Sequence, residues 1–179
     1  ARLGHAVTVE TITTRGDQSA VLPVSRIGGD GVFVRELEQA LRESRVDVAV
    51  HSLKDLPTAD APGLELACVP IRATAFDALV APPGTSLETL PAGAIVGTSS
   101  IRRVVQLRAL RPDLEIRPVR GNVDTRLRRL DEGRCQALVL AAAGLERLGF
   151  ASRIAALLEP PAFWPAVAQG ALAIEIRSD

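Results

Sequence analysis

The sequence predicts an α/β protein in which helices flank largely parallel sheets. Short apolar runs rich in β-branched residues alternate along the chain with amphipathic segments, which is typical of strand–helix–strand units. The chain has 179 residues, of which 47% are hydrophobic, enough for one large domain or two small ones. No apolar run approaches the roughly 20 residues of a membrane-spanning helix, so a soluble protein is expected.

The first part of the chain contains three strand patterns and one helix pattern. Apolar residues alternate over residues 7–13, which predicts a strand. Residues 32–45 repeat apolar positions at helical spacing. The apolar face of this predicted helix comprises Phe33, Leu37, Ala40 and Leu41. Residues 46–50 and 64–69 predict two further strands, because proline and glycine interrupt the chain between them.

The rest of the chain alternates between the two patterns. Strands are predicted over residues 78–81, 94–97, 115–119, 137–141 and 171–176. Helices are predicted over residues 99–110, 124–131, 144–148 and 152–158. Ser99 or Ser100 can cap the first of these helices, and Arg111-Pro112 ends it. Breaks near residues 72–75 and 165–170 divide the predicted elements between two sheets.

Positive charge is concentrated in one segment of a chain whose net charge is zero. Residues 1–97 carry eight basic and twelve acidic groups, whereas residues 98–134 carry ten arginines and five acidic groups. Lys54 is the only lysine. The basic segment lacks aromatic residues on which bases could stack, so no nucleic-acid partner is expected.

The two cysteines are expected to be small buried apolar residues. Cys68 and Cys135 lie far apart in apolar surroundings, and His5 and His51 are the only imidazoles. A structural zinc site needs four ligands, so no metal is expected. Free cysteines are typical of a reducing compartment, which favours the cytoplasm.

The strongest local motif is AIVGTSSIRR, where a predicted strand ends at Gly97 and a helix begins after Ser100. Backbone N–H groups at a helix N-terminus attract anions, and Thr98, Ser99 and Ser100 add hydroxyl donors. Arg102 and Arg103 can supply guanidinium groups suited to carboxylate or phosphate. The alternative is an ordinary helix cap followed by solvated arginines.

Two more predicted strand ends carry arginines. Arg120 and Gly121 follow the strand predicted over residues 115–119, and Arg126 lies on the first turn of the helix after it. Arg128 and Arg129, further along that helix, are expected to form a solvated face. The strand predicted over residues 137–141 leads to Arg147. If the sheet is parallel, all three ends point arginines at one crevice.

The segment HSLKD places Lys54 beside Asp55 just after a predicted strand. A carboxylate there could stabilise a developing cation or move protons. A lysine could neutralise an acidic substrate or form an imine. The alternative is a surface ion pair on a turn, which contributes little energy. His51 without partners is more often structural than catalytic.

Taken together, HSLKDLP (51–57), VGTSSIRR (96–103), RPDL (111–114), VRGNVDTRL (119–127), AAAGLERL (141–148) and AQGALAIE (168–175) resemble the porphobilinogen deaminase, or hydroxymethylbilane synthase, family. The resemblance implies two domains similar to type II periplasmic binding proteins, with a hinge and an interdomain cleft. Domain one would comprise residues 1–73 plus 170–179, and domain two residues 76–164. A third, cofactor-bearing domain is expected to be absent from this chain.

The resemblance also implies an activity. Family members join four porphobilinogen molecules into hydroxymethylbilane with loss of ammonia, as cytoplasmic enzymes that are expected to be monomeric. The polypyrrole product grows on a dipyrromethane cofactor that is held by a cysteine. This cysteine is expected to lie outside the present sequence, so the 179-residue protein chain alone is expected to be inactive. The alternative function is a two-domain binding module for a small carboxylate anion.

Site residues follow from the same resemblance. Asp55 would be the catalytic carboxylate that stabilises the azafulvene-like cation formed as ammonia leaves. The residues expected to bind cofactor or substrate are Ser52, Lys54, Thr98, Ser100, Arg102, Arg103, Arg120, Gly121, Arg126, Arg147 and Gln169. Asp30, in the glycine-rich segment 28–31, departs from the family, which commonly has lysine there.

Overall fold

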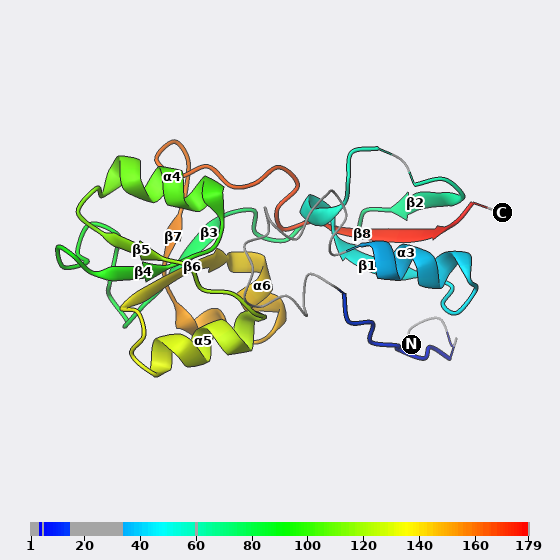
Figure 1. The fold of residues 1–179 in the computed structure, drawn as a ribbon, viewed down its shortest axis with the longest axis horizontal. Helices are drawn as coiled ribbons and strands as arrows, with labels where there is room; N and C mark the ends of the chain where they lie inside the picture. The colour runs from blue at the N-terminus through cyan, green and yellow to red at the C-terminus, as the bar shows by residue number, and fades with distance from the viewer. Residues whose placement is uncertain (1–3, 5, 15–33, 60, 179) are drawn as a thin grey trace.

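The strands form two separate sheets that lie side by side (Figure 1). The structure is a computed structural model and describes residues 4, 6–14, 34–59 and 61–178. Asp30, the rest of the glycine-rich segment and Phe33 lie outside these residues. The chain passes from the first sheet to the second before residue 77 and returns after residue 158.

The smaller sheet has the order β1-β8-β2, with β1 at Ala49–Ser52, β8 at Leu172–Arg177 and β2 at Leu64–Cys68. Both outer strands are antiparallel to β8. Helix α3 (Arg35–Arg42) contributes Leu41 to a small core with residues of β1 and β2. The 3₁₀ turn η1 (Leu53–Asp55) follows β1 directly, which fixes the position of the HSLKD motif.

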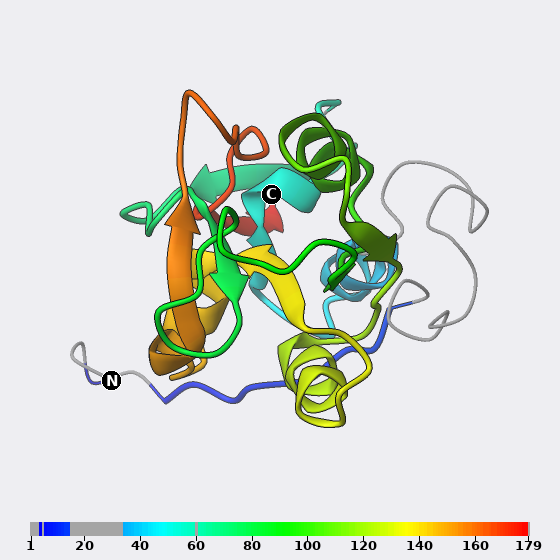
Figure 2. The same ribbon diagram turned by 90° about the vertical axis from the view of Figure 1, so that its left-hand side faces the viewer.

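The larger sheet has the order β5-β4-β6-β3-β7. Its strands are β3 (Asp77–Val80), β4 (Ile95–Gly97), β5 (Glu115–Arg117), β6 (Ala137–Ala141) and β7 (Ile154–Leu158). Strand β4 is parallel to β5 and β6, whereas β3 is antiparallel to its neighbours β6 and β7. Strands β3 and β6 are buried on both faces, because helices cover the sheet on two sides (Figure 2).

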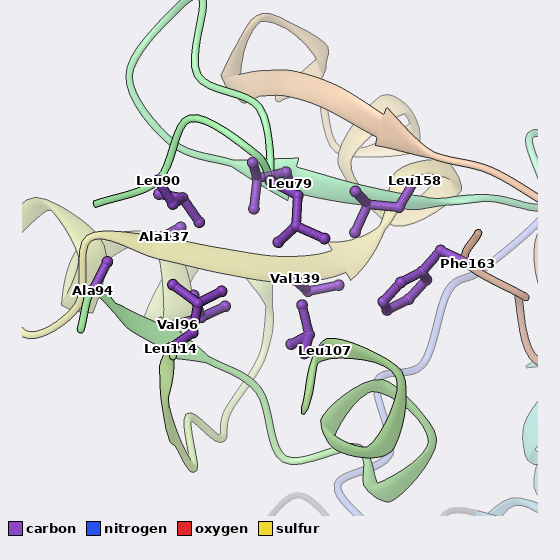
Figure 3. Packing of buried hydrophobic residues seen from close by; sticks show 11 residues of the cluster. Leu79, Leu90, Ala94, Val96, Leu107, Leu114, Ala137, Val139, Leu158 and Phe163 are labelled. Carbon is purple, nitrogen blue, oxygen red and sulfur yellow. The ribbon is translucent and has the colours of Figure 1, made fainter. Parts of the chain in front are cut away.

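Alternate residues of the central strands pack on opposite helices. On one face, Leu107 of α4 (Ile101–Leu110) packs with Val139 and with the buried ring of Phe163 (Figure 3). On the other face, Leu127 of α5 (Val123–Asp131) and Leu145 of α6 (Ala142–Arg147) pack with the remaining residues of these strands. This three-layer packing fixes where the strand ends, and the loops after them, are placed.

The α/β class is confirmed, but the prediction of largely parallel sheets is wrong. Among the described strands, four of the six pairings are antiparallel. In each sheet the reversed strand, β8 or β3, is the one entered from the connection between the sheets. Helical crossovers give parallel neighbours only along β4–α4–β5–α5–β6, where one helix separates successive strands.

Two element predictions are wrong. Residues 152–158 were expected to be helical, but η2 (Ala151–Arg153) is followed by β7, whose pairing with β3 overrides the helix preference of its alanines and leucines. Residues 7–13 form no strand in the described region, and Val7 and Val9 are exposed. Alternation there does not mark a buried face. The other elements predicted in described regions are confirmed, with shifts at their ends.

Cys135 is buried as predicted, but Cys68 is exposed, which corrects the expectation for that residue. Every residue of β2 after Leu64 is exposed, so Cys68 lies at an uncovered end of that strand. No helix within the described ranges has the length and apolarity needed to cross a bilayer.

Candidate anion-binding site

A cavity of about 830 Å³ is lined by residues attached to both sheets. The first sheet contributes η1, and the second contributes the loops that follow β4 and β5. Nine of the residues singled out from the sequence line this cavity, namely Lys54, Asp55, Ser100, Arg102, Arg103, Arg120, Gly121, Arg126 and Gln169. The fold therefore brings together polar side chains that are distant in the sequence, such as Lys54 and Gln169, which lie 115 positions apart.

Turn η1 presents Lys54 and Asp55 to this cavity. Burial lowers the pKa of the Lys54 ammonium, and the neighbouring Asp55 carboxylate partly opposes that effect. The Asp55 side chain is partly exposed at the rim of the cavity. Burial of its remaining part raises the pKa of Asp55, and the Lys54 ammonium partly opposes this shift. Both shifts disfavour the charged forms, so each group is closer to neutrality than on an open surface.

Beneath this turn, β1 is tied to β8 by a buried pair. His51 Nε2 lies 3.1 Å from Glu175 Oε2, and both side chains are almost fully buried. Burial raises the pKa of Glu175, with the neighbouring imidazole as an opposing influence. The structural interpretation of His51 agrees with this placement, because the pair lies behind η1 and holds the strand that leads into it.

The corner between β4 and α4 is held by its own polar groups. Thr98 is buried, its N–H donates to Arg117 O at 2.9 Å, and its Oγ1 accepts from Ser100 N at 3.3 Å. Ser99 Oγ donates to Val119 O at 3.0 Å. Thr98 therefore lies behind the cavity wall and does not line it, whereas Ser99 and Ser100 do.

The twin arginines differ in what they can offer to a ligand. Arg103 is buried, and its Nε and Nη2 donate to Asp77 Oδ1 at 3.0 and 2.7 Å. Its Nη1 donates to Val139 O at 3.0 Å, so the guanidinium is engaged inside the protein. Arg102 is half-buried and pairs with Asp77 Oδ2 at 2.7 Å, while its Nη1 donates to Trp164 O.

The loop after β5 and the start of α5 bring several arginines close together. Burial and the nearby Arg103, Arg120 and Arg129 lower the pKa of Arg126 to about 10. Its Nε donates to Gly121 O at 2.7 Å. Gly121 has φ +108, and a Cβ there would lie 2.8 Å from Thr125 Cγ2, so this turn requires glycine. An anion entering here would relieve the mutual repulsion of the arginines.

Two further predicted site residues do not line the cavity. Ser52 ends β1 with an exposed side chain. Arg147 at the end of α6 is exposed, and its Nη2 donates to Gly170 O at 2.6 Å. The third strand end therefore directs its arginine to the returning connection between the sheets, and the expected convergence holds for two of the three ends.

Several lining residues were missed by the sequence analysis. Residues 11–13 contribute to the wall, although only their strand-like alternation distinguishes them. Arg129, expected on a solvated face, also lines the cavity, which corrects that interpretation. Asn122 was missed as well: its side chain accepts from Thr125 N at 3.0 Å, and an Asn three residues before a Thr at a helix start is a recognisable cap.

Fold and cavity together define an α/β protein whose two sheets share one cavity lined by several arginines. A family model described as "Porphobilinogen deaminase, dipyromethane cofactor binding domain" matches residues 1–179. The chain belongs to the porphobilinogen deaminase family.

Curated relatives agree with this assignment. The chain is 56% identical to a porphobilinogen deaminase of Roseiflexus sp. (strain RS-1) over 179 residues, and 55% identical to one of Albidiferax ferrireducens over 177 residues. These alignments cover 100% and 99% of the chain but 59% and 56% of the relatives. The chain thus spans a little over half the length of the relatives it matches.

Solved structures give weaker similarity. A periplasmic substrate-binding protein of an ABC transporter from Coxiella burnetii aligns with a TM-score of 0.47 and 14% identity, covering 79% of this chain and 68% of that one. The periplasmic VFT2 domain of Bordetella pertussis BvgS aligns with a TM-score of 0.46 and 19% identity, covering 80% and 60%.

Proposed function

We propose that this chain forms the substrate-binding part of an enzyme that joins four porphobilinogen molecules into hydroxymethylbilane with loss of ammonia. The observation that carries the proposal is that Lys54 and Asp55 face the arginines of the β4 and β5 loops within one cavity. A site for carboxylate-bearing pyrroles needs several cations, and a step that expels ammonia needs a carboxylate near the cation that forms.

The residues present fit the dipyrromethane group that the family model names. Each pyrrole of this group carries acetate and propionate arms, so it is a polyanion. Burial, and after it the neighbouring arginines, depress the pKa of Arg126, and a polyanion would relieve the repulsion between these arginines. When bound, the group supplies a covalent primer to which pyrrole units are added.

Each part of the cavity has a separate task in this proposal. Arg120 and Arg126 bind carboxylate arms, and Arg102 contributes from the start of α4, after the neighbouring strand β4. Lys54 balances the charge of the incoming pyrrole. Asp55 accepts a hydrogen bond from the pyrrole N–H and stabilises the cation left when the C–N bond breaks. The leaving amine takes up a proton and departs as ammonia.

The domain organisation is part of the same proposal. Residues 1–73 plus 170–179 would form domain one and residues 76–164 domain two, with a hinge at the two connections and the cavity in the cleft, as in type II periplasmic binding proteins. The separate cores of the two sheets support this division. We further propose that the enzyme acts as a cytoplasmic monomer.

The test of the function is Asp55→Asn in the full-length protein, assayed for ammonia release and hydroxymethylbilane formation. We expect turnover to fall about 100-fold or more, with porphobilinogen binding retained because the arginines remain. Asp131→Asn is the matched control, since Asp131 is exposed and pairs with Arg153 away from the cavity. Turnover by Asp55→Asn equal to that of the control would contradict the proposed role, and binding without ammonia release by the parent protein would favour a carboxylate-binding module.

A further inference from the structure

Asp77 lies at the start of β3, where the chain enters the second sheet, and its side chain is fully buried. Two cations contact its carboxylate, Arg103 at Oδ1 and Arg102 at Oδ2, both at 2.7 Å. Gln169 Nε2 donates to the same Oδ1 at 3.0 Å. One buried carboxylate therefore receives side chains from both α4 and the returning connection.

These contacts control how Arg102 and Arg103 face the cavity. A buried arginine without a counter-charge is costly, so Arg103 stays against Asp77 and Val139 O. Arg102 shares that carboxylate, and the exposed fraction of its side chain is 26%, so it is held at the cavity wall. Asp77 thus limits the reach of Arg102, although Asp77 itself does not line the cavity.

The same carboxylate is linked to the first sheet through Gln169. This amide is fully buried, and its Nε2 donates to Asp77 and also to Ala75 O at 2.8 Å. Those two acceptors fix the amide orientation, which leaves Oε1 to accept from Lys54 Nζ at 3.4 Å. A chain of contacts therefore joins Lys54 on η1 to Asp77 on β3 across the connection between the sheets.

We propose that Asp77 is a positioning residue: through direct contacts it sets Arg102 and Arg103, and through Gln169 it sets the Lys54 ammonium. The placement depends only on contacts between groups of the chain itself. Its catalytic consequence rests on the proposed function, whereas the placement itself does not.

The first test uses Lys54, the only lysine in this chain, as a single NMR reporter. Lysine labelled with ¹³C and ¹⁵N gives one side-chain signal in the 179-residue chain, and its titration can be followed in Asp77→Asn. Asp55 and Asp77 raise the pKa of Lys54, whereas burial, Arg103 and Arg102 lower it. Removing the Asp77 charge leaves the arginines uncompensated, so the Lys54 titration is expected to move to lower pH.

Gln169→Met tests the link without creating a buried unpaired charge. It keeps the side-chain volume but removes the acceptor of the Lys54 ammonium, so the Lys54 signal is expected to shift and again titrate at lower pH. Asp131→Asn, away from the cavity, is expected to leave the signal unchanged. If Asp77→Asn fails to fold, Gln169→Met alone decides the link, because it leaves the Asp77–Arg103 ion pair in place.

A folded Asp77→Asn that leaves the Lys54 signal and titration as in the parent chain overturns the proposal, as does an unchanged signal in Gln169→Met. In the full-length protein, Asp77→Asn is expected to lower kcat about 100-fold with a smaller change in KM, because misplaced groups act mainly on the reaction step. If the parent protein does not convert porphobilinogen at all, the proposed function fails while the lysine measurement still decides the placement.

Discussion

Lys54 and Asp55 are neighbours in sequence whose pKa values move toward each other. Burial raises the pKa of the carboxyl and lowers that of the ammonium, and their mutual attraction opposes both shifts only in part. Both residues are therefore charged over a narrower pH range than free side chains would be. The cause is the burial of these side chains in turn η1.

The pH profile of turnover is expected to reflect this narrowing. In the proposed mechanism, turnover needs Asp55 ionised and Lys54 protonated, so it should fall as pH drops through a value above the ordinary 3.8 of the carboxyl. It should also fall as pH rises through a value below the ordinary 10.5 of lysine. Measuring kcat/KM against pH checks both limbs.

Lys54→Arg is expected to move the alkaline limb upward, since a guanidinium stays charged. Arg128→Gln, an exposed change outside the cavity, should leave both limbs in place. An acidic limb at or below the ordinary carboxyl range would show that Asp55 does not control it.

The sequence predicts which cavity residues lie near strand ends, but it does not predict the hydrogen-bond and ion-pair partners of those residues. Arg120 lies in the loop after β5 and Arg126 on the first turn of α5, and both line the cavity. Arg103 shares a motif with Arg102, yet its donors are taken by Asp77, which lies 26 positions earlier in the chain. A tertiary contact of this kind leaves no local spacing to read, and the same holds for Arg147 and Gly170.

Helix α3 ends with a residue that is unusual for its conformation. Ser44 has φ 54, in the left-handed region, and its N–H donates to Leu41 O at 2.9 Å as the helix closes. Glycine is the usual residue at this position, because it lacks the Cβ that makes the left-handed region unfavourable. The side chain of Ser44 is exposed, so nothing else requires a serine there.

Ser44→Gly is expected to stabilise the chain. The left-handed conformation costs roughly 1–2 kcal/mol for a residue with a Cβ. The greater freedom of glycine in the unfolded chain offsets about 0.4–1 kcal/mol of that gain. We expect the free energy of unfolding to rise by about 0.5–1 kcal/mol, measured by urea denaturation. Ser44→Ala should stay close to the parent, and a lower midpoint for the glycine variant would refute the explanation.

The element predictions that failed share one cause. In β7 the helix-favouring sequence is overridden by pairing with β3, and in residues 7–13 a strand-like alternation finds no partner strand among the described residues. Elements that bury a face against a helix, such as α5 with Leu127, carry their pattern in their own sequence. Local pattern therefore determines elements that pack on a core, whereas edge segments depend on which neighbours the fold provides.

The two sheets differ in how much core they possess. Strands β3 and β6 are buried almost throughout, whereas β2 is buried only at Leu64. Among the residues that the structure describes, the larger sheet packs on two apolar clusters, while the smaller one shares a cluster of three buried residues with α3. Local stability follows buried apolar contact, so the two parts should open at different free energies.

Hydrogen exchange is expected to separate the two sheets. Amides of β3, β4 and β6 should exchange slowest, and those of β1 and β2 markedly faster, because the smaller core resists opening less. Mass spectrometry on peptides from each strand provides the comparison. Equal protection in both sheets would mean that the chain unfolds as a single cooperative unit.

Strand β8 is the shared neighbour of β1 and β2, and it contains the last strand residues of the chain. A pulling force applied just after Arg177 along the strand axis would load both of its ladders in shear, and all of these bonds must break together. Once β8 slides out, β1 and β2 share no neighbour. Turn η1 would then lose its anchor, and the cavity would lose Lys54 and Asp55 in one mechanical event while the arginines of the larger sheet stay in place.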